Sequence, residues 1–302
     1  MQPDPDGAPR ARDPSRDEAG HALLFGGSGP LGSAVLARLL AAGWRVDALS
    51  RAPREARPGL RWWRGDLGAM PALPETCDAV LSCGPLDLFA AWYAAAGPRA
   101  RRVVAFGSTS ATTKRTSADA GERDLAARLA GAESTLLDAA PRRGAGAVVL
   151  RPTLVYGGQA PLALERMAEM ARRRGLFVLP RGATGLRQPV HVDDLAGAAM
   201  AALAAPDAAT GRGYDLPGGE ALPYREMVAR VLAAQAPEAR LLEVPGPAFA
   251  LLAGLLRSAG RLPGFGRAAQ ARLREDLAFD PAPAAEALGY APRPFRPGAP
   301  GA

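Results

Sequence analysis

The sequence predicts an α/β protein built on a doubly wound parallel sheet, and two observations carry this prediction. Short apolar segments alternate with helical segments from residue 21 to residue 151. A glycine-rich turn separates the first apolar segment from the first helical one. Strands that alternate with helices lie parallel and are joined by right-handed crossovers, which produces a sheet covered by helices on both faces.

Six strands and three helices are expected in the first half of the chain. The expected strands cover residues 21–25, 45–49, 60–63, 78–82, 102–106 and 147–151. The expected helices cover residues 31–42, 90–96 and 122–140. The first helix is followed by Gly43, a usual residue at a helix C-terminus. We assign residues 19–157 to one domain and expect residues 1–18 to be a disordered tail.

The rhythm changes after Arg151, where proline-rich breaks separate shorter elements. Helices are expected at residues 161–174, 192–205 and 224–234, and strands at residues 177–179, 213–216 and 241–244. We expect residues 158–302 to form a smaller α/β lobe, in which residues 186–206 pack back on the sheet and residues 293–302 form a loose end. Ligand sites are often found where such a lobe meets the sheet.

Composition narrows the class of protein. The 302 residues are 48% hydrophobic, which is enough for a core of substantial size. The net charge is +7, but the basic residues are scattered and Lys114 is the only lysine, so we expect no nucleic-acid partner. Cys77 and Cys83 are the only cysteines and indicate neither a disulfide framework nor a metal site. A polar N-terminus and an apolar segment at residues 249–256 that is too short to span a membrane indicate a cytoplasmic protein.

The glycine-rich turn predicts a dinucleotide site of the Rossmann type. Its residues are Gly26, Gly27, Ser28, Gly29, Pro30, Leu31 and Gly32. Two spacings fit, G-x-G-x-x-G from Gly27 and the looser G-x-x-G-x-x-G from Gly26. Glycine allows the tight turn and the close approach of the backbone to a pyrophosphate, which the N-terminus of the following helix attracts. The alternative is a turn with a purely structural role.

The end of the second strand favours NADP over NAD as the cofactor. An NAD site usually has an acidic residue here for the ribose hydroxyls, but this strand ends at Ser50 and Arg51, which suit a 2′-phosphate. Asp47 lies inside the strand, where we do not expect it to reach the ribose. The alternative for Arg51 is a solvated loop residue. Asp66 and Leu67, after the third strand, are expected beside the adenine.

Six segments together resemble the extended short-chain dehydrogenase/reductase superfamily, and within it the NAD(P)-dependent epimerase/dehydratase group. They start at residues 26, 65, 106, 150, 188 and 214 and read Gly-Gly-Ser-Gly-Pro-Leu-Gly, Gly-Asp-Leu, Phe-Gly-Ser-Thr-Ser, Leu-Arg-Pro-Thr-Leu-Val-Tyr-Gly, Gln-Pro-Val-His-Val-Asp-Asp-Leu and Tyr-Asp-Leu-Pro-Gly-Gly. The resemblance covers residues 21–295. It implies an NAD(P)-binding oxidoreductase or epimerase/dehydratase with a small-molecule substrate, a nucleotide sugar or another carbinol or ketone. It also implies a homodimer.

The resemblance further implies a catalytic Ser or Thr after the fifth strand and a Tyr-x-x-x-Lys pair on the next helix. In such a pair the tyrosine exchanges a proton with the substrate oxygen, and the lysine lowers the pKa of the tyrosine. Ser108 and Thr109 match the first element. When the Ala-Glu at residues 132–133 is aligned with the family's usual Ala-Glu, Leu125 and Leu129 stand at the tyrosine and lysine positions.

Three interpretations follow from the missing pair, and the first is an enzyme with a relocated acid/base. No tyrosine or lysine occurs from residue 115 to residue 155, which leaves Lys114 and Tyr156 as the candidates near the cleft. The pKa of a lysine shifts more readily than that of an arginine. The alternatives are a lysine exposed on a loop and an aromatic residue that packs at a strand end. Arg187 is the candidate to hold a phosphate or carboxylate of the substrate.

The second interpretation is a cofactor-binding protein without turnover, a redox sensor or structural partner that resembles the accessory subunit of respiratory complex I. The apolar helix at residues 249–256 would then be a docking surface; the alternative is a core helix. The third interpretation is a binder of sugar nucleotides that uses the same fold. His191 is expected to be structural, at the start of a helix that Asp193 or Asp194 caps.

Overall fold

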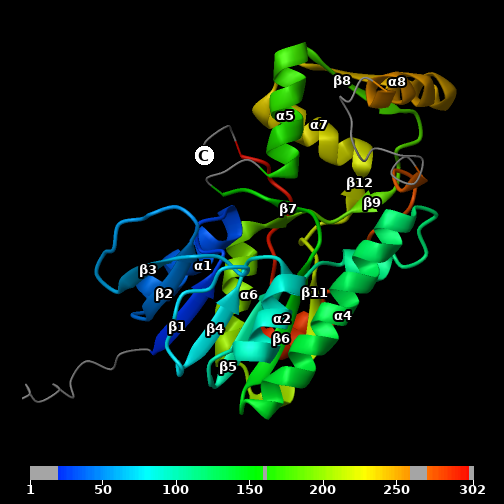
Figure 1. The fold of residues 1–302 in the computed structure, drawn as a ribbon. Helices are drawn as coiled ribbons and strands as arrows, with labels where there is room; N and C mark the ends of the chain where they lie inside the picture. The colour runs from blue at the N-terminus through cyan, green and yellow to red at the C-terminus, as the bar shows by residue number, and fades with distance from the viewer. Residues whose placement is uncertain (1–19, 159–161, 259–270, 299–302) are drawn as a thin grey trace, which may run out of the picture.

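A seven-stranded parallel sheet forms the centre of the protein (Figure 1). The computed structural model describes residues 20–158, 162–258 and 271–298. The strand order is β11-β6-β5-β4-β1-β2-β3, and every pairing in this sheet is parallel. The run 3-2-1-4-5-6 within this order is that of a doubly wound nucleotide-binding fold. The predicted fold class is therefore confirmed.

The six strands predicted in the first half are all present, with ends that differ by no more than one residue. The strands of the sheet are β1 (His21–Phe25), β2 (Arg45–Ser50), β3 (Leu60–Arg64), β4 (Ala79–Ser82), β5 (Arg102–Phe106), β6 (Gly146–Pro152) and β11 (Arg212–Leu216). The strand predicted at residues 213–216 is β11. It pairs with β6 from Arg212 opposite Val148 to Leu216 opposite Pro152, so it extends the main sheet.

Four helices cover the two faces of the sheet (Figure 1). They are α1 (Pro30–Ala41) and α6 (Val192–Ala204), which contact each other on one face, and α2 (Leu86–Ala96) and α4 (Ala120–Arg142), which contact each other on the opposite face. Alternate residues of β1 enter alternate cores: Leu24 packs in the core under α1, and Leu23 packs in the core under α2. Because both faces are buried, the strands are apolar throughout.

A smaller group of elements lies beyond the carboxyl ends of the strands, at the top of Figure 1. Its helices are α5 (Ala163–Arg174), α7 (Tyr224–Gln235) and α8 (Gly246–Ser258). Its paired strands are β8 (Leu176–Pro180) with β13 (Arg240–Val244) and β9 (Leu186–Arg187) with β12 (Leu222–Pro223). β7 (Val155–Tyr156) and β10 (Val190–His191) pair between this group and the sheet. The division into two domains at residue 157 stays a prediction.

The C-terminal segment is held firmly as far as the structure describes it. α10 (Ala282–Leu288) packs against β11 and α6. The loose end expected at residues 293–302 is wrong for residues 293–298, because Phe295 is buried and the Arg293 guanidinium contacts Asp194 at 2.9 Å. The tail expected at residues 1–18 lies outside the described residues.

Candidate functional site

The turn after β1 depends on glycine at two positions. Gly26 has a φ of 72°, and its carbonyl oxygen accepts a hydrogen bond of 3.0 Å from the Gly29 amide. A side chain on Gly32 would collide with the same carbonyl oxygen. Gly27 does not have a positive φ, and a Cβ there would only press on the Leu24 side chain. The structure therefore favours the spacing Gly26-x-x-Gly29-x-x-Gly32 of the two that fit the sequence.

The N-terminus of α1 has free hydrogen-bond donors. Its N-cap is Gly29, which has no side chain to cap the helix, and Pro30 at the first position has no N–H. The Ser33 amide donates to the Gly29 carbonyl at 2.8 Å. The amides of Leu31 and Gly32 have no acceptor among the described residues. Such amides, at the positive end of a helix dipole, are suited to a phosphate.

The loop after β2 carries two arginines. Ser50 is buried at the strand end, and its hydroxyl accepts a hydrogen bond of 3.3 Å from Nε of Arg54. The Arg54 guanidinium lies 5.2 Å from the ring centre of Trp62, while Arg51 is exposed. Asp47 pairs with His21 at 2.8 Å. Positive charge therefore gathers at the tip of β2, and Arg54 adds a residue that the sequence analysis missed.

Asp66 and Leu67 follow β3. The Asp66 carboxylate accepts hydrogen bonds of 2.9 Å from the amides of Gly68 and Ala69, which close a tight turn. Leu67 is half-buried beside Gly84, in the turn after β4. These contacts place the Leu67 side chain against the loop that follows the central strand β4.

A cavity of about 470 Å³ opens beyond the carboxyl ends of β5 and β6. Polar lining residues come from the loops after these strands and from the facing elements: Ser108, Thr109, Ser110, Thr113, Lys114, Thr153, Arg187, Gln188, Tyr224 and Arg272. Apolar lining residues come mainly from α5, α7, β8 and the segment before α10: Leu154, Ala163, Leu164, Met167, Met170, Phe177, Met227, Leu273, Leu277 and Phe279. Ligands of doubly wound sheets bind at this edge.

The predicted residues Ser108, Thr109 and Lys114 line this cavity together. The Ser108 hydroxyl accepts a hydrogen bond of 3.1 Å from the Ser110 amide, so its own proton stays available to a ligand. The buried Thr109 hydroxyl donates to the Pro152 carbonyl at 3.3 Å, which ties the loop to β6. Lys114 belongs to the end of a single helical turn, α3 (Ser110–Thr113), and is largely buried.

Arg187, predicted to bind substrate, also lines the cavity. Its Nη1 donates to the carbonyls of Leu186 at 2.6 Å and Glu275 at 2.9 Å, and its Nη2 donates to the Arg272 carbonyl. A guanidinium has five N–H donors, so two remain for a ligand. Burial lowers the pKa of Arg187, and the Tyr224 ring lies 5.4 Å from the guanidinium.

Glu122 links Lys114 to a distant part of the chain. Its carboxylate pairs with the Arg272 guanidinium, accepts a hydrogen bond of 2.7 Å from Ser117, and lies 3.7 Å from the Lys114 ammonium. Burial raises the pKa of Glu122, but the hydrogen bonds from Arg272 and Ser117 outweigh this, so the pKa lies below its usual value. Glu122 is therefore an anion that fixes Lys114 beside the cavity.

Tyr156 does not lie with these residues. It is buried with its ring edge-on to His191 and Phe295, and its hydroxyl accepts a long hydrogen bond of 3.4 Å from the Arg296 amide. Burial raises the pKa of Tyr156. His191 itself caps α6, because its Nδ1 accepts from the Asp193 amide at 3.2 Å. The prediction that Asp193 or Asp194 caps this helix is wrong; Asp194 binds Arg293.

The register of α4 places leucine at both positions of the missing pair. Glu133 is buried and its two carboxylate oxygens bind the Arg151 guanidinium on β6. This ion pair fixes the helix at the residues used for the alignment. Leu125 and Leu129 are half-buried on the same helix. Neither side chain can exchange a proton.

Sequence reasoning missed Arg272, Tyr224, Gln188 and the apolar wall of the cavity. Arg272 lies 150 residues from Glu122, and no local pattern shows that they meet. Tyr224 begins α7 after a proline, which reads as an ordinary helix start. Gln188 follows Arg187 in the quoted motif and could have been found there; its side chain accepts from the Phe279 amide at 2.6 Å.

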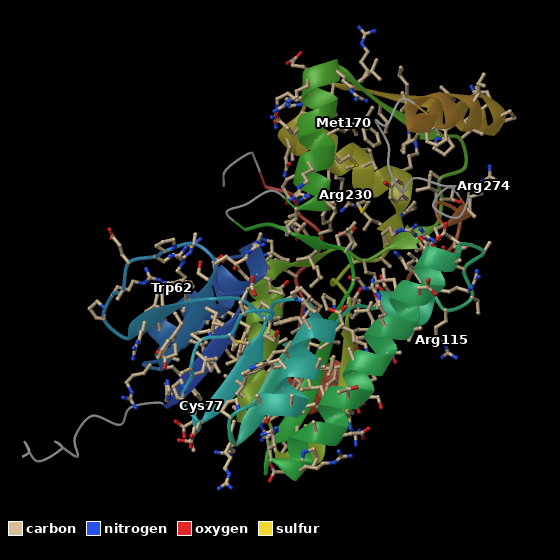
Figure 2. The ribbon with its side chains drawn as sticks, viewed as in Figure 1. Trp62, Cys77, Arg115, Met170, Arg230 and Arg274 are labelled. Atoms are coloured by element: carbon tan, nitrogen blue, oxygen red, sulfur yellow. The ribbon has the colours of Figure 1, made fainter. Side chains whose placement is uncertain are left out.

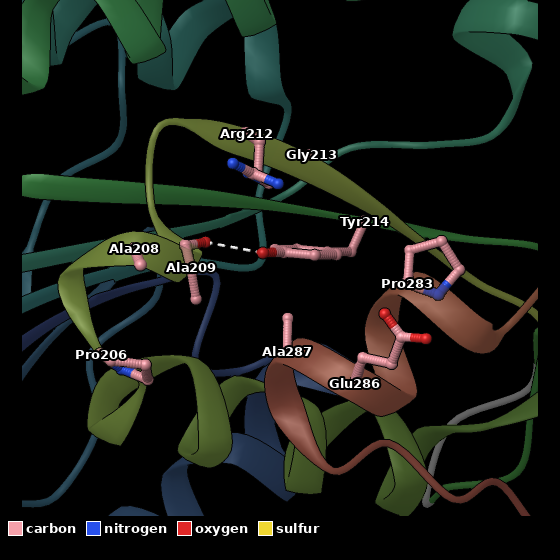
Figure 3. Close-up of a pocket in the computed structure, with 9 residues that line it drawn as sticks. All are labelled: Pro206, Ala208, Ala209, Arg212, Gly213, Tyr214, Pro283, Glu286 and Ala287. Carbon is pink, nitrogen blue, oxygen red and sulfur yellow. Dashed lines mark hydrogen bonds between the residues drawn. The ribbon is translucent and has the colours of Figure 1, made fainter.

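A second cavity, of about 500 Å³, lies beside β11 and α10 (Figure 3). Alanine and proline form much of its wall, with Arg212 and Glu286 as its charged residues. The Tyr214 hydroxyl on its wall donates to the Ala209 carbonyl at 2.8 Å, in the loop that includes the short helix η1 (Asp207–Ala209). This cavity is at the amino end of β11, the edge opposite the one at which such sheets bind ligands.

Among the described residues, no group of three or more His, Cys, Asp or Glu side chains is placed to hold a metal ion. Burial raises the pKa of Cys83 to about 12, which makes its thiol a poor nucleophile. In the part of the chain that the structure describes, no helix combines the length and apolar character needed to cross a bilayer.

The sheet, its glycine turn and the cavity define a doubly wound α/β protein of the dinucleotide-binding type, and solved structures share this fold. No protein-family model and no curated protein sequence matches the chain. It is similar to MoeE5 in complex with UDP-glucose and NAD, with 20% identity over 91% of this chain and 94% of that one and a TM-score of 0.64. It is similar to the epimerase Mth375 of Methanothermobacter thermautotrophicus, with 16% identity over 92% and 89% and a TM-score of 0.66.

A third structure is UDP-glucuronic acid 4-epimerase from Bacillus cereus in complex with NAD, with 12% identity over 91% of this chain and 94% of that one and a TM-score of 0.65. The chain therefore has, over nearly its whole length, the fold of nucleotide-sugar epimerases. The predicted resemblance is confirmed at the level of the fold.

Proposed function

We propose that the chain is an NADP-dependent oxidoreductase or epimerase/dehydratase of the extended short-chain dehydrogenase/reductase type, acting at a carbinol or ketone carbon of a small molecule. The observation that carries the proposal is the joint placement of Ser108, Thr109 and Lys114 on one cavity beyond the carboxyl ends of β5 and β6. The similar solved structures hold NAD, and MoeE5 also holds UDP-glucose, at this level of fold.

The turn after β1 would hold the pyrophosphate of the cofactor. The free amides of Leu31 and Gly32 support this assignment, because they have no acceptor among the described residues. Ser50 and Arg51, together with Arg54, would hold the 2′-phosphate that distinguishes NADP from NAD. When bound, the cofactor supplies or accepts the hydride.

Asp66 and Leu67 would flank the adenine. Leu67 is the better supported of the two, because it packs beside the turn after β4, whereas the Asp66 carboxylate is engaged in its own turn.

Two side chains would handle the substrate oxygen. Ser108 donates its hydroxyl proton to that oxygen and positions the reacting carbon. Lys114 exchanges a proton with the same oxygen, in place of the missing tyrosine. Tyr156 is the second candidate for this proton, but it faces the Arg296 backbone rather than the cavity. Arg187 would hold an anionic group of the substrate with its two free N–H donors.

The alternative is a cofactor-binding protein without turnover, and Leu125 and Leu129 favour it because they remove the usual acid/base pair. Such a protein would bind NADPH and oxidise it with no ketone. A binder of sugar nucleotides would instead take UDP-glucose without needing NADPH.

The test combines binding with turnover. We expect the purified protein to bind NADPH more tightly than NADH, measured by the fluorescence of the reduced nicotinamide, and to oxidise it in a screen of ketones and nucleotide sugars. Lys114→Ala should lower kcat by about 10²–10⁴-fold, the range for a general acid or base, with NADPH binding unchanged. Arg115→Ala, an exposed neighbour, is the matched control.

Two outcomes would contradict the proposal. Full turnover by Lys114→Ala together with its loss in Tyr156→Phe would move the proton to the tyrosine. Failure to bind either dinucleotide would remove the cofactor and with it the reaction class.

A further inference from the structure

The cavity divides into a polar end and an apolar wall. The polar residues lie on the loops after β5 and β6 and around β9, where Lys114, Arg187 and Arg272 bring three cations together. None of the described lining residues carries a carboxylate. Glu122, which lies behind the lining, pairs with Lys114 and Arg272 but makes no contact with Arg187. The charge at this end therefore suits one anionic group.

Most polar atoms at that end already have partners inside the protein. The hydroxyls of Thr109 and Thr113 donate to the carbonyls of Pro152 and Thr109, and the Thr153 hydroxyl donates to the Gln188 carbonyl. The groups left for a ligand are listed by the contacts that are missing: the Ser108 proton, the Ser110 hydroxyl, the Lys114 ammonium, two N–H donors of Arg187 and the Tyr224 hydroxyl. This set is enough for one small charged head.

The opposite wall offers no polar side chain. It is formed by Leu164, Met167, Met170, Phe177, Met227 and Leu277. Met170, on α5 at the top of Figure 2, is half-buried, as are Phe177 and Leu277. Apolar surface that faces a cavity gains free energy when an apolar ligand covers it. Methionine adapts its shape to such ligands.

A nucleotide does not suit this wall. The edge of a nucleobase and the ribose hydroxyls lose hydrogen bonds to water on entry, and each polar group left unpaired costs free energy. The side chains that could replace those bonds are confined to the charged end, where the diphosphate would have to lie as well.

We infer that the substrate is an amphipathic anion, with a phosphate or carboxylate held at Arg187 and Lys114 and an apolar body lying against Met167, Met170 and Phe177, rather than a nucleotide sugar. The inference rests on the proposed function, because it takes the cavity as the substrate site. A volume of about 470 Å³ lies within the usual range for such sites.

The experiment measures binding to the protein saturated with NADPH, after NADPH binding has been established separately. The probes are decyl phosphate, inorganic phosphate and UDP-glucose, titrated by calorimetry. We expect decyl phosphate to bind at least about tenfold more tightly than either of the other two. Met170→Gln should weaken decyl phosphate about tenfold by removing apolar contact and leave NADPH binding unchanged. Met170→Leu should restore it.

Leu88→Gln is the matched control, because Leu88 is an exposed apolar residue on α2 with 52% of its surface accessible, and it should change neither affinity. The inference is overturned if UDP-glucose binds most tightly, if inorganic phosphate equals decyl phosphate, if no probe binds, or if Met170→Gln has no effect. Loss of NADPH binding in the wild-type protein is a separate result, which would sink the proposed function.

Discussion

Gly32 shows how much of the cofactor site rests on one residue. Its Cα faces the Gly26 carbonyl oxygen, and the same oxygen accepts from the Gly29 amide, so three positions of the turn are held in mutual contact. A single methyl group at Gly32 has no free space, because its neighbours are backbone atoms that cannot rotate away. The helix start and the strand end would have to separate to admit it.

Gly32→Ala is therefore expected to lose both stability and cofactor binding. Overpacking of this kind costs about 1–3 kcal/mol of unfolding free energy. NADPH affinity should fall as well, because the free amides at the start of α1 would move. Urea unfolding and a fluorescence titration measure the two effects.

Gly131→Ala provides the control, since a Cβ there meets nothing within 4 Å on the exposed face of α4. It should raise stability by up to about 1 kcal/mol through helix propensity alone. Equal behaviour of the two variants would show that the turn is not packed as described.

At the scale of elements, α4 is fixed by one ion pair. Glu133 on α4 is buried and binds Arg151 on β6, which also lies 3.6 Å from Asp215 on β11. Three elements thus meet at one guanidinium. Burial raises the pKa of Asp215, while Arg151 opposes that change.

Glu133→Gln should lower the unfolding free energy by about 3 kcal/mol, the lower end for breaking a buried pair and leaving its partner charged. Glu169→Gln on α5 is the control. Glu169 pairs with Arg172 and Arg173 on the exposed surface, where such pairs contribute less than about 1 kcal/mol. Chemical denaturation of both variants measures the difference, and similar losses would contradict a special role for Glu133.

The elements also show what a sequence can predict. The strands β1, β4 and β5 are buried on both faces, so their apolar runs are unambiguous. The place of β11 in the main sheet was not predictable, because the pattern of residues 213–216 predicts a strand but not the neighbour that it joins. Two-residue strands such as β7 and β10 are too short to leave any pattern.

The candidate site divides in the same way. Its first half, the glycine turn and the loop at Ser108, is local in sequence and was predicted. The second half was not, because Arg272 reaches Glu122 only through the folded chain. The cap at His191 was missed because histidine is an uncommon capping residue.

At the scale of the whole molecule, the cavity is closed by parts of the chain that are far apart in sequence. Glu122 at the start of α4 binds Arg272, and the Arg272 carbonyl accepts from Arg187 at the end of β9. The Glu275 carbonyl accepts from the same guanidinium. The segment before α10 is thus attached to the sheet side through Glu122 and to the smaller group of elements through Arg187.

This attachment depends on the charge of Glu122 and so on pH. The pKa of Glu122 in the folded protein lies below its ordinary value of 4.5, because the hydrogen bonds from Arg272 and Ser117 outweigh the effect of burial. A carboxyl group with a lowered pKa contributes stability that is present above its ordinary pKa and is lost as the pH falls through the folded value. Glu122→Gln removes that contribution.

We therefore expect Glu122→Gln to be less stable than the wild-type protein at neutral pH, and the difference to shrink as the pH falls below 4.5. Urea unfolding at a series of pH values measures it. Glu243→Gln, which breaks a pair with Arg225 on the outside of the smaller group of elements, serves as the control and should show a smaller difference at neutral pH. A difference for Glu122→Gln that stays constant into acid would mean that the amide is simply a poorer fit, and that the charge of Glu122 does not join Arg272 to the sheet.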